Sequence, residues 1–276
     1  MAALGVALGG GGVLCAAELG VLQALQEMRV PVDAMAGTSG GGIIAGALAA
    51  GVPLDAVIAT WRIVCAHPDK YGLGPVRAME GVFQESPAPG CWDLQQVLDD
   101  LLLHDAAETV GGWDRHYGVT TTVLPWMRAL DIHAGGAYRE LPTASALRAT
   151  SAYPGLFCGL RTPDAELWVD GGILQDVPIA LCSRLGADHV LAVSFLSDPT
   201  MPAQLDPLGL VERTVAFLVT RVQVPAPPDV HAVRIPVQLP PGAGLLSYGL
   251  FGALVKAGHD AAMARRHQIE DLTVPF

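Results

Sequence analysis

A serine set among glycines is the first group in this sequence that could perform covalent chemistry. Ser39 lies in Gly37-Thr38-Ser39-Gly40-Gly41, which fits the G-x-S-x-G pattern of a nucleophile elbow. In an elbow, a strained turn from a strand into a helix exposes the serine hydroxyl, and Gly37 and Gly41 leave room for the backbone. The helix N-terminus that follows favours negative charge on a reacting oxygen. The same pentapeptide also fits a glycine-rich turn in which Ser39 caps the next helix.

A second glycine-rich turn precedes this serine. The run Gly9 to Gly12 joins a predicted strand to a predicted helix, so its backbone N–H groups could hold either a phosphate or an oxyanion. The phosphate interpretation fits poorly, because the following Val13-Leu14-Cys15 lacks the lysine of a phosphate-binding loop, and Leu14 stands where a dinucleotide fingerprint needs a small residue. We therefore expect an oxyanion hole formed by the N–H groups of Gly10, Gly11 and Gly12.

A serine hydroxyl needs a base to accept its proton. The best candidate is Asp170, which ends a predicted strand and precedes Gly171-Gly172; in an apolar cleft its pKa would rise until it can act as the base. A Ser–Asp–His triad is also compatible with the order of residues along the chain. It would use one of the histidines that follow Asp170, which we expect to be structural or solvated: His189, His231, His259 and His267.

Taken together, these motifs resemble the patatin-like phospholipase family. The resemblance covers the glycine run with Glu18-Leu19-Gly20-Val21-Leu22, the Ser39 elbow, the stretch 149–157 (ATSAYPGLF) and Asp170-Gly171-Gly172 with Pro178. It extends from residue 4 to about residue 195. It implies a Ser39–Asp170 dyad without histidine, in a three-layer α/β/α fold that hydrolyses acyl esters of lipids.

Three positions depart from the family pattern. Leu14 and Cys15 stand where the family usually has Arg or Lys and then Gly, and Asp176 stands where it usually has Asn. Without the cation, a phosphodiester beside Leu14 would be desolvated without compensation, so we expect a preference for uncharged esters, to which the acids Glu18 and Asp176 would add. In the alternative, Leu14 packs in the core and another cation, such as Arg148 or Arg161, serves a phosphate.

The elements that must position these groups alternate between strands and helices. Strands are predicted at 4–8, 32–36, 117–124 with a hairpin continuing to 138, 167–169, 189–195 and 230–237. Helices are predicted at 14–29, 43–50, 53–66, 93–103, 145–152, 177–185, 208–222 and 246–267. This alternation predicts a single domain over 1–276 with a mostly parallel sheet between two helical layers, and 67–90 as a loop or lid over the site.

Composition narrows the function further. Apolar residues make up 51% of the chain and the formal net charge is −11, so we expect a large core, no nucleic acid partner, and any transient membrane contact to be apolar. The five dispersed cysteines favour neither a disulfide framework nor a metal site, and we expect no metal and no cofactor. Residues 1–26 carry only one charged side chain but lack the basic start of a signal peptide, so a cytoplasmic location is expected.

The motifs leave three functions open. The leading hypothesis is a serine hydrolase of lipid or small acyl esters. One alternative is a catalytically weak member that binds acyl chains or a partner, which the departures at Leu14, Cys15 and Asp176 would suggest. The other is an acyltransferase, which would use the same elbow to pass the acyl group to an alcohol or thiol.

Overall fold

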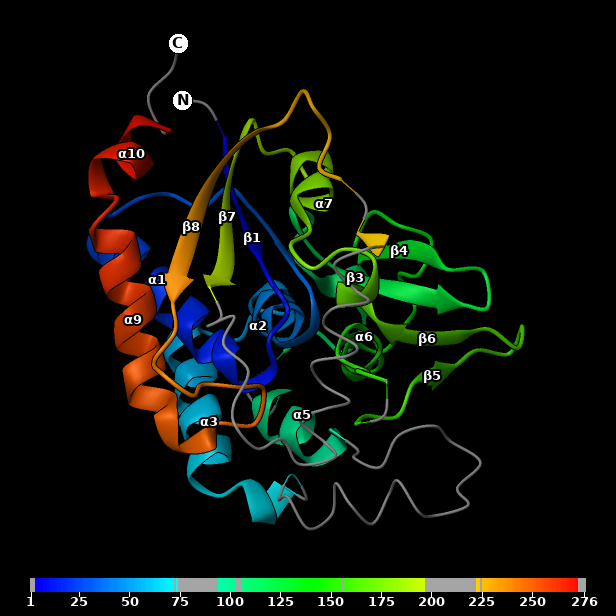
Figure 1. The fold of residues 1–276 in the computed structure, drawn as a ribbon. Helices are drawn as coiled ribbons and strands as arrows, with labels where there is room; N and C mark the ends of the chain where they lie inside the picture. The colour runs from blue at the N-terminus through cyan, green and yellow to red at the C-terminus, as the bar shows by residue number, and fades with distance from the viewer. Residues whose placement is uncertain are drawn as a thin grey trace.

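The computed structural model describes residues 3–71, 73, 94–102, 106–154, 156–196, 222–223 and 225–272. Its strands form one mixed sheet in the order β5-β6-β3-β2-β1-β7-β8, with β4 also paired to β3 (Figure 1). The strands are β1 (Leu4–Leu8), β2 (Ala34–Gly37), β3 (Tyr117–Leu124), β4 (Arg128–His133), β5 (Leu160–Arg161), β6 (Leu167–Asp170), β7 (His189–Leu196) and β8 (His231–Gln238). The five strands β1, β2, β3, β7 and β8 pair in parallel, whereas β4 and β6 run antiparallel to β3.

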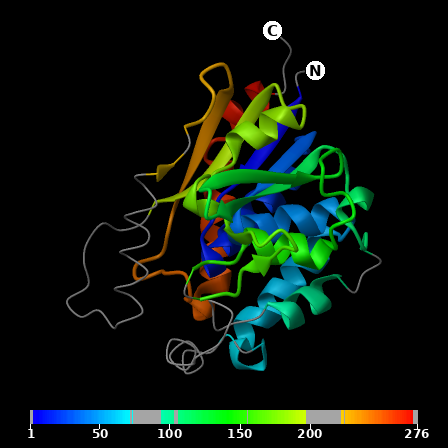
Figure 2. The ribbon, with the colours of Figure 1, turned by 90° about the vertical axis from the view of Figure 1, so that its right-hand side faces the viewer.

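Helices cover both faces of this sheet. They are η1 (Gly12–Cys15), α1 (Ala16–Glu27), α2 (Ser39–Ala49), α3 (Leu54–Ala66), η2 (Pro68–Tyr71), α5 (Gln95–Leu102), η3 (Val110–Gly112), α6 (Thr143–Thr150), η4 (Gly171–Ile173), α7 (Ile179–Arg184), η5 (Tyr248–Leu250), α9 (Phe251–Met263) and α10 (Arg266–Asp271). Strand β1 begins and helix α10 ends at the same end of the molecule, while α3 and α5 lie at the end toward which β1 and β7 run (Figures 1 and 2). The expected three-layer fold with a mostly parallel sheet is confirmed.

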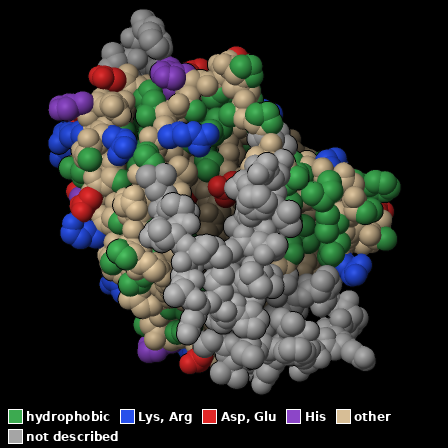
Figure 3. Space-filling model, viewed as in Figure 1, with side chains coloured by type: hydrophobic (Ala, Val, Ile, Leu, Met, Phe, Trp, Pro, Cys, Tyr) green, Lys and Arg blue, Asp and Glu red, His purple; other side chains and the backbone are tan. Residues whose placement is uncertain are grey.

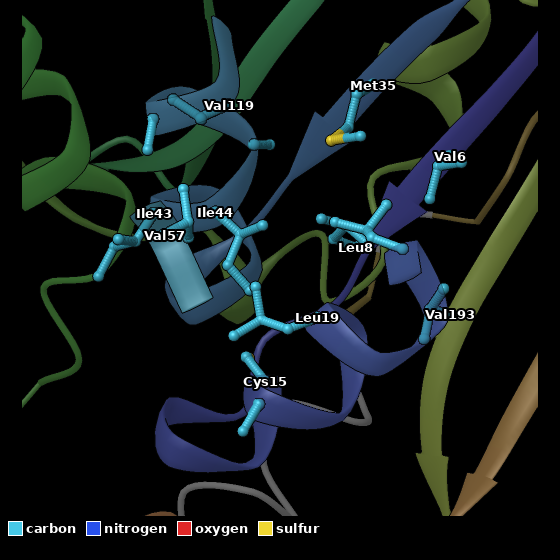
Figure 4. Close-up of a cluster of buried hydrophobic side chains, with 14 of the residues drawn as sticks. Val6, Leu8, Cys15, Leu19, Met35, Ile43, Ile44, Val57, Val119 and Val193 are labelled. Atoms are coloured by element: carbon cyan, nitrogen blue, oxygen red, sulfur yellow. The ribbon is translucent and has the colours of Figure 1, made fainter. Parts of the chain in front are cut away.

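The two faces of the sheet have different cores, because successive strand residues point to opposite sides. Val6 and Leu8 belong to the large cluster shared with α1, α2 and α9, and Figure 4 shows Leu8 beside Leu19 and Ile44 of two of these helices. Ala7 belongs to a smaller cluster with α7, in which the strands contribute mainly alanine and valine. The larger cluster therefore supplies most of the apolar burial that stabilises the fold.

Two glycines let α1 and α9 pack with their backbones in contact. A Cβ added at Gly20 would overlap the main-chain oxygen of Val255, and one added at Gly258 would overlap that of Ala17. Any larger residue at either position would force the helices apart. This contact attaches the C-terminal helix to the helix that follows the glycine run.

Two helices begin several residues from their predicted starts, and the helix expected at 246–267 is divided into α9, which ends at Met263, and α10, which begins at Arg266. Helix α2 begins at Ser39 rather than near residue 43, because the weak helix formers Gly40 to Gly42 are required by close packing: a Cβ at Gly42 would lie 2.7 Å from the Thr150 side chain. The C-terminal helix begins at Phe251 rather than at 246, because the preceding turn holds η1, where the N–H of Val13 donates to the oxygen of Leu245 at 3.0 Å.

Other predictions fall partly or wholly outside the described residues. Of the helix expected at 208–222, only residue 222 is described. Residue 93, where another helix was expected to begin, lies outside the described residues. Of the expected loop or lid at 67–90, the structure describes only 67–71, which includes η2, and residue 73. No helix in the described part of the chain combines the length and apolar character needed to cross a bilayer.

Candidate active site

The Ser39 turn has the backbone geometry of a strained elbow. Ser39 has φ 53°, in the left-handed region that non-glycine residues rarely adopt, and it is the first residue of α2, directly after β2. The turn closes so tightly that a Cβ at Gly37 would overlap the main-chain oxygen of Gly41. Close backbone packing, which the flanking glycines permit, therefore holds Ser39 at the N-terminus of α2.

Two threonines attach this turn to neighbouring elements. The N–H of Ser39 donates to Oγ1 of Thr150 at 3.2 Å, and that hydroxyl in turn donates to the oxygen of Thr120 at 2.5 Å. The hydroxyl of Thr38 donates to the oxygen of Gln175 at 2.8 Å. Neither Thr38 nor Thr150 was singled out from the sequence for such a role, although both lie within the family-like stretches.

Asp170 reaches the same site from an antiparallel strand. Its N–H donates to the oxygen of Ala152 at 3.0 Å, and its Oδ1 accepts from the N–H of Gly172 at 2.8 Å. The side chain is 2% exposed, and Oδ2 has no hydrogen-bond partner of normal geometry. One oxygen of the carboxyl is thus fixed by its own turn, and the other has no such partner among the described residues.

The protonation of Asp170 is set mainly by burial. Burial raises the pKa of Asp170 to about 7, against partial lowering by the Ser39 hydroxyl and the Gly172 N–H, and the charge of Asp176 raises it further. The hydroxyl of Ser39 is thus close enough to lower this pKa, although no hydrogen bond of normal length and angle joins the two side chains. Such contacts often tighten only when substrate binds.

The glycine run divides its N–H groups between structure and cavity. The N–H of Gly10 donates to the main-chain oxygen of Asp176 at 3.1 Å, so it already has an acceptor. Among the described residues, no acceptor is found for the N–H groups of Gly11 and Gly12. These two donors, rather than all three predicted glycines, are therefore available to an oxyanion in this conformation.

Ser39, Asp170 and the three glycines line one cavity of about 450 Å³. Its wall is mostly apolar and comes from elements distant in sequence, including η1, α3, α5 and the turn before α9. Representative lining residues are Leu14, Trp61, Val97, Phe157, Phe195 and Tyr248. A cavity of this size and character suits an acyl chain or a similar apolar ligand.

Asp176 also lines this cavity. Its side chain is solvent-accessible even though many protein atoms surround it, because the cavity opens beside it. The surrounding protein raises the pKa of Asp176 to about 6, while the N–H of Gly10 and the charge of Arg234 lower it in part. A Cβ added at Gly10 would lie 3.3 Å from both Oδ1 of Asp176 and Cβ of Ser39, so Asp176 borders the nucleophile.

Glu18 lies on the underside of the two loops instead. It is fully buried, and a Cβ at Gly41 would lie 2.8 Å from its Oε2 and 2.5 Å from the oxygen of Gly9. Burial raises the pKa of Glu18 well above its usual range, and contacts with the Gly9 N–H and Cys15 lower it only in part. Glu18 is fully buried and does not line the cavity, so the expectation that it would repel an anionic headgroup is wrong.

The histidines that would complete a triad lie elsewhere. His189 and His231 start β7 and β8, and because β7 is parallel to β1 they lie at the sheet edge opposite to Ser39, with their Nδ1 atoms 3.1 Å apart. His259 contacts Glu27 through Nε2 at 2.9 Å, and the side chain of His267 is 96% exposed. None of the four lines the cavity. In the described part of the chain, no cluster of three or more His, Cys, Asp or Glu residues could hold a metal ion.

The chain thus combines a three-layer α/β/α fold with a serine elbow and a separate aspartate that line one cavity. The sequence matches the model of the patatin-like phospholipase family over residues 6–182, and the chain belongs to that family. It is 30% identical over 195 residues to the patatin-like phospholipase domain-containing protein ZK370.4 of Caenorhabditis elegans, covering 69% of this chain and 13% of that protein. It is 28% identical to an NTE family protein of Mycobacterium tuberculosis, covering 72% of this chain and 51% of that protein.

The solved structures support the fold alone. VipD from Legionella pneumophila superposes with a TM-score of 0.52 at 15% identity, covering 97% of this chain and 67% of that chain. The chain spans 13% of the length of the Caenorhabditis elegans relative and 51% of the length of the Mycobacterium tuberculosis relative.

Proposed function

We propose that the protein hydrolyses acyl ester bonds of lipids or small esters, with Ser39 as nucleophile and Asp170 as base. Membership of a phospholipase family supports lipid hydrolysis in general. The observation that carries the finer proposal is that Ser39, which follows β2, and Asp170, which ends β6, line one mostly apolar cavity from the two strands that flank β3.

In the acylation step, Oγ of Ser39 attacks the acyl carbonyl carbon while Asp170 accepts the hydroxyl proton. The negative charge that develops on the carbonyl oxygen is stabilised by the N–H groups of Gly11 and Gly12 and by the N-terminus of α2. When the tetrahedral intermediate collapses, the leaving alcohol takes the proton from Asp170, and the acyl group remains on Ser39.

In the deacylation step, Asp170 removes a proton from water, and the resulting hydroxide equivalent attacks the acyl-enzyme. Collapse of the second intermediate returns the proton from Asp170 to Ser39 and releases the fatty acid. A pKa near 7 suits both halves of this cycle, because the same carboxyl must accept and return a proton near neutral pH.

A fluorophosphonate probe tests this proposal, because it modifies only activated serines. We expect labelling of wild type at Ser39 and none of Ser39→Ala, with hydrolysis of nitrophenyl esters lost in parallel. Ser151 is a matched control: it lines the same cavity, but its hydroxyl donates to the oxygen of Leu147 at 2.6 Å. Ser151→Ala should therefore keep the label.

The results also separate the alternatives. An unlabelled wild type that still binds fatty acid would indicate an acyl-chain binder. A labelled enzyme whose turnover depends on an added alcohol or thiol, and not on water, would indicate an acyltransferase.

A further inference from the structure

The charges that line the cavity are all negative in the described part of the chain. The charged lining residues are Asp170 and Asp176, and no Lys, Arg or His of the described residues contributes to the wall. Figure 3 shows acidic atoms beside the hollow near the centre of one face of the molecule. Neither Arg148 nor Arg161, the cations considered from the sequence, lines the cavity.

The two carboxyls differ in what they can meet. Asp170 is 2% exposed and held by its own turn, whereas Asp176 is accessible from the cavity. A Cβ at Gly10 would touch Asp176 and Ser39 equally, at 3.3 Å, so the two side chains flank the glycine loop where the ester must lie. Any charge that the substrate carries near its ester bond therefore lies close to the Asp176 carboxylate.

Among the described residues, the opposing charge that acts on Asp176 belongs to Arg234, which lies on β8 and is exposed. Its effect on Asp176 is electrostatic, and it does not line the cavity. Leu14, which does line the cavity, adds apolar surface beside the glycine loop and no charge. A phosphate in this place would lose its water beside two carboxylates without a cation of the described wall to pair with it.

We propose that this cavity selects acyl esters whose alcohol portion carries no negative charge, and that Asp176 is the residue that sets this preference. The proposal rests on the proposed ester hydrolysis and names its substrate class. The substrates would be neutral or cationic esters, such as glycerides or amino-alcohol esters, in preference to anionic phosphodiesters. Charges a few ångströms apart in a partly desolvated site change affinity by tenfold or more, which makes the effect measurable.

A charge series of substrates tests the proposal on the wild-type enzyme. Three octanoate esters with alcohols of similar size carry a quaternary ammonium, a tertiary butyl group or a carboxylate, so their charges are +1, 0 and −1. At pH 8 we expect kcat/KM for the neutral ester to exceed that for the anionic ester by at least about tenfold, with the cationic ester at least equal to the neutral one. Equal rates for the anionic and neutral esters would overturn the proposal.

The variant Asp176→Asn assigns the effect to one residue, because Asn keeps the size and the acceptor oxygen without the charge. We expect the neutral-to-anionic ratio to fall at least threefold, mainly through KM. Asp164→Asn is the matched control, since Asp164 is exposed on the turn between β5 and β6, away from the cavity lining, and should leave the ratio unchanged. An unchanged ratio in Asp176→Asn overturns the role of Asp176.

Ser39→Ala separates this proposal from the proposed function. If Ser39→Ala hydrolyses all three esters as well as wild type, the proposed function itself fails. If Ser39→Ala loses all three activities while wild type shows no charge preference, hydrolysis through Ser39 stands and only the charge selection fails.

Discussion

Acidic side chains lie on both sides of the two glycine loops, and protein atoms surround all of them. Those on one side line the cavity, and the one on the other side does not. On the cavity side, burial raises the pKa of Asp170 to about 7 and that of Asp176 to about 6, so both ionise near neutrality. On the underside, Glu18 is enclosed completely with Cys15, and burial raises its pKa well above its usual range. The acids beside the cavity are open to a bound ligand, whereas the enclosed acid is not.

The difference teaches that burial alone does not make a carboxyl functional. Asp170 combines burial with an oxygen that lacks a partner, and it lines the same cavity as Ser39. Glu18 also has oxygens without partners of normal geometry, but it faces the backbone of Gly9 and Gly41. The two acids therefore differ in access to the cavity rather than in burial.

The largest effect is expected on the cavity side. Ser39→Ala and Asp170→Asn should each lower kcat by at least about a thousandfold, because the members of such a unit act together. Circular dichroism and thermal melting should show both variants folded. The double variant should be little worse than either single variant. Turnover by Asp170→Asn near the wild-type value would contradict the dyad, and a histidine variant as damaging as these would indicate a triad instead.

The next largest effect concerns pH. Because Asp170 must be ionised to accept the serine proton, kcat/KM should fall about tenfold per pH unit below pH 7 and level off above it. A profile with its midpoint near pH 4 would mean that the burial of Asp170 does not govern the reaction. Asp164→Asn, which changes an exposed carboxyl, should leave the profile unchanged.

The free energy of unfolding should fall as pH rises, whereas the activity should increase. The pKa of Asp170 is raised from 3.8 in the unfolded chain to about 7, so the folded state binds more protons in between. This contribution to the free energy of unfolding is complete below about pH 4 and is lost as pH rises through 7. Urea unfolding at pH 5 and pH 8 should therefore show Asp170→Asn gaining stability relative to wild type at pH 8, on the order of 1–4 kcal/mol. No gain at pH 8 would argue against a strained, ionised Asp170.

A smaller effect on activity is expected from the underside. Glu18→Gln keeps the shape of a buried side chain that does not line the cavity, so kcat/KM should stay within about threefold of wild type with an unchanged pH profile. Glu18→Ala should instead lower the free energy of unfolding by about 2–4 kcal/mol, because it leaves a cavity beneath both loops. A thousandfold loss in Glu18→Gln, with the protein folded, would place Glu18 among the groups that need a charge.

The smallest effect is expected from chelation. EDTA should leave kcat/KM unchanged, because the proposed steps use only Ser39, Asp170 and backbone N–H groups. A loss of activity that zinc or calcium restores would reveal a metal requirement that the described residues do not account for.

The fold class and the candidate site residues could be predicted from local patterns. The strand at 4–8 and the strand at 117–124 have the predicted bounds, because runs of apolar and β-branched residues between turns need no distant information. The elbow at Ser39 and the turn after Asp170 are likewise local, because glycine is required where the backbone approaches itself closely. The order of these motifs along the chain was enough to indicate the family and the candidate dyad.

The way in which the motifs meet was decided by tertiary structure. Strand β3 pairs with Gly37 of β2 through Val119 and then continues five residues farther, so the antiparallel β6 can return and place Asp170 opposite Thr121. Nothing local in the sequence indicates that β6 is antiparallel, because the direction of a strand depends on its partners.

Long-range packing also decided what each acid and each N–H meets. The Gly10 N–H is engaged by Asp176, which lies 166 positions away, and Thr150 supports the elbow from α6. Whether Glu18 faces the cavity or the interior depends on how α1 lies against α2 and α9, which is set by apolar burial summed over many residues. The sequence by itself thus determined which groups could react, and the tertiary structure decided which of them share a cavity, because pKa and access depend on neighbours that are distant in the chain.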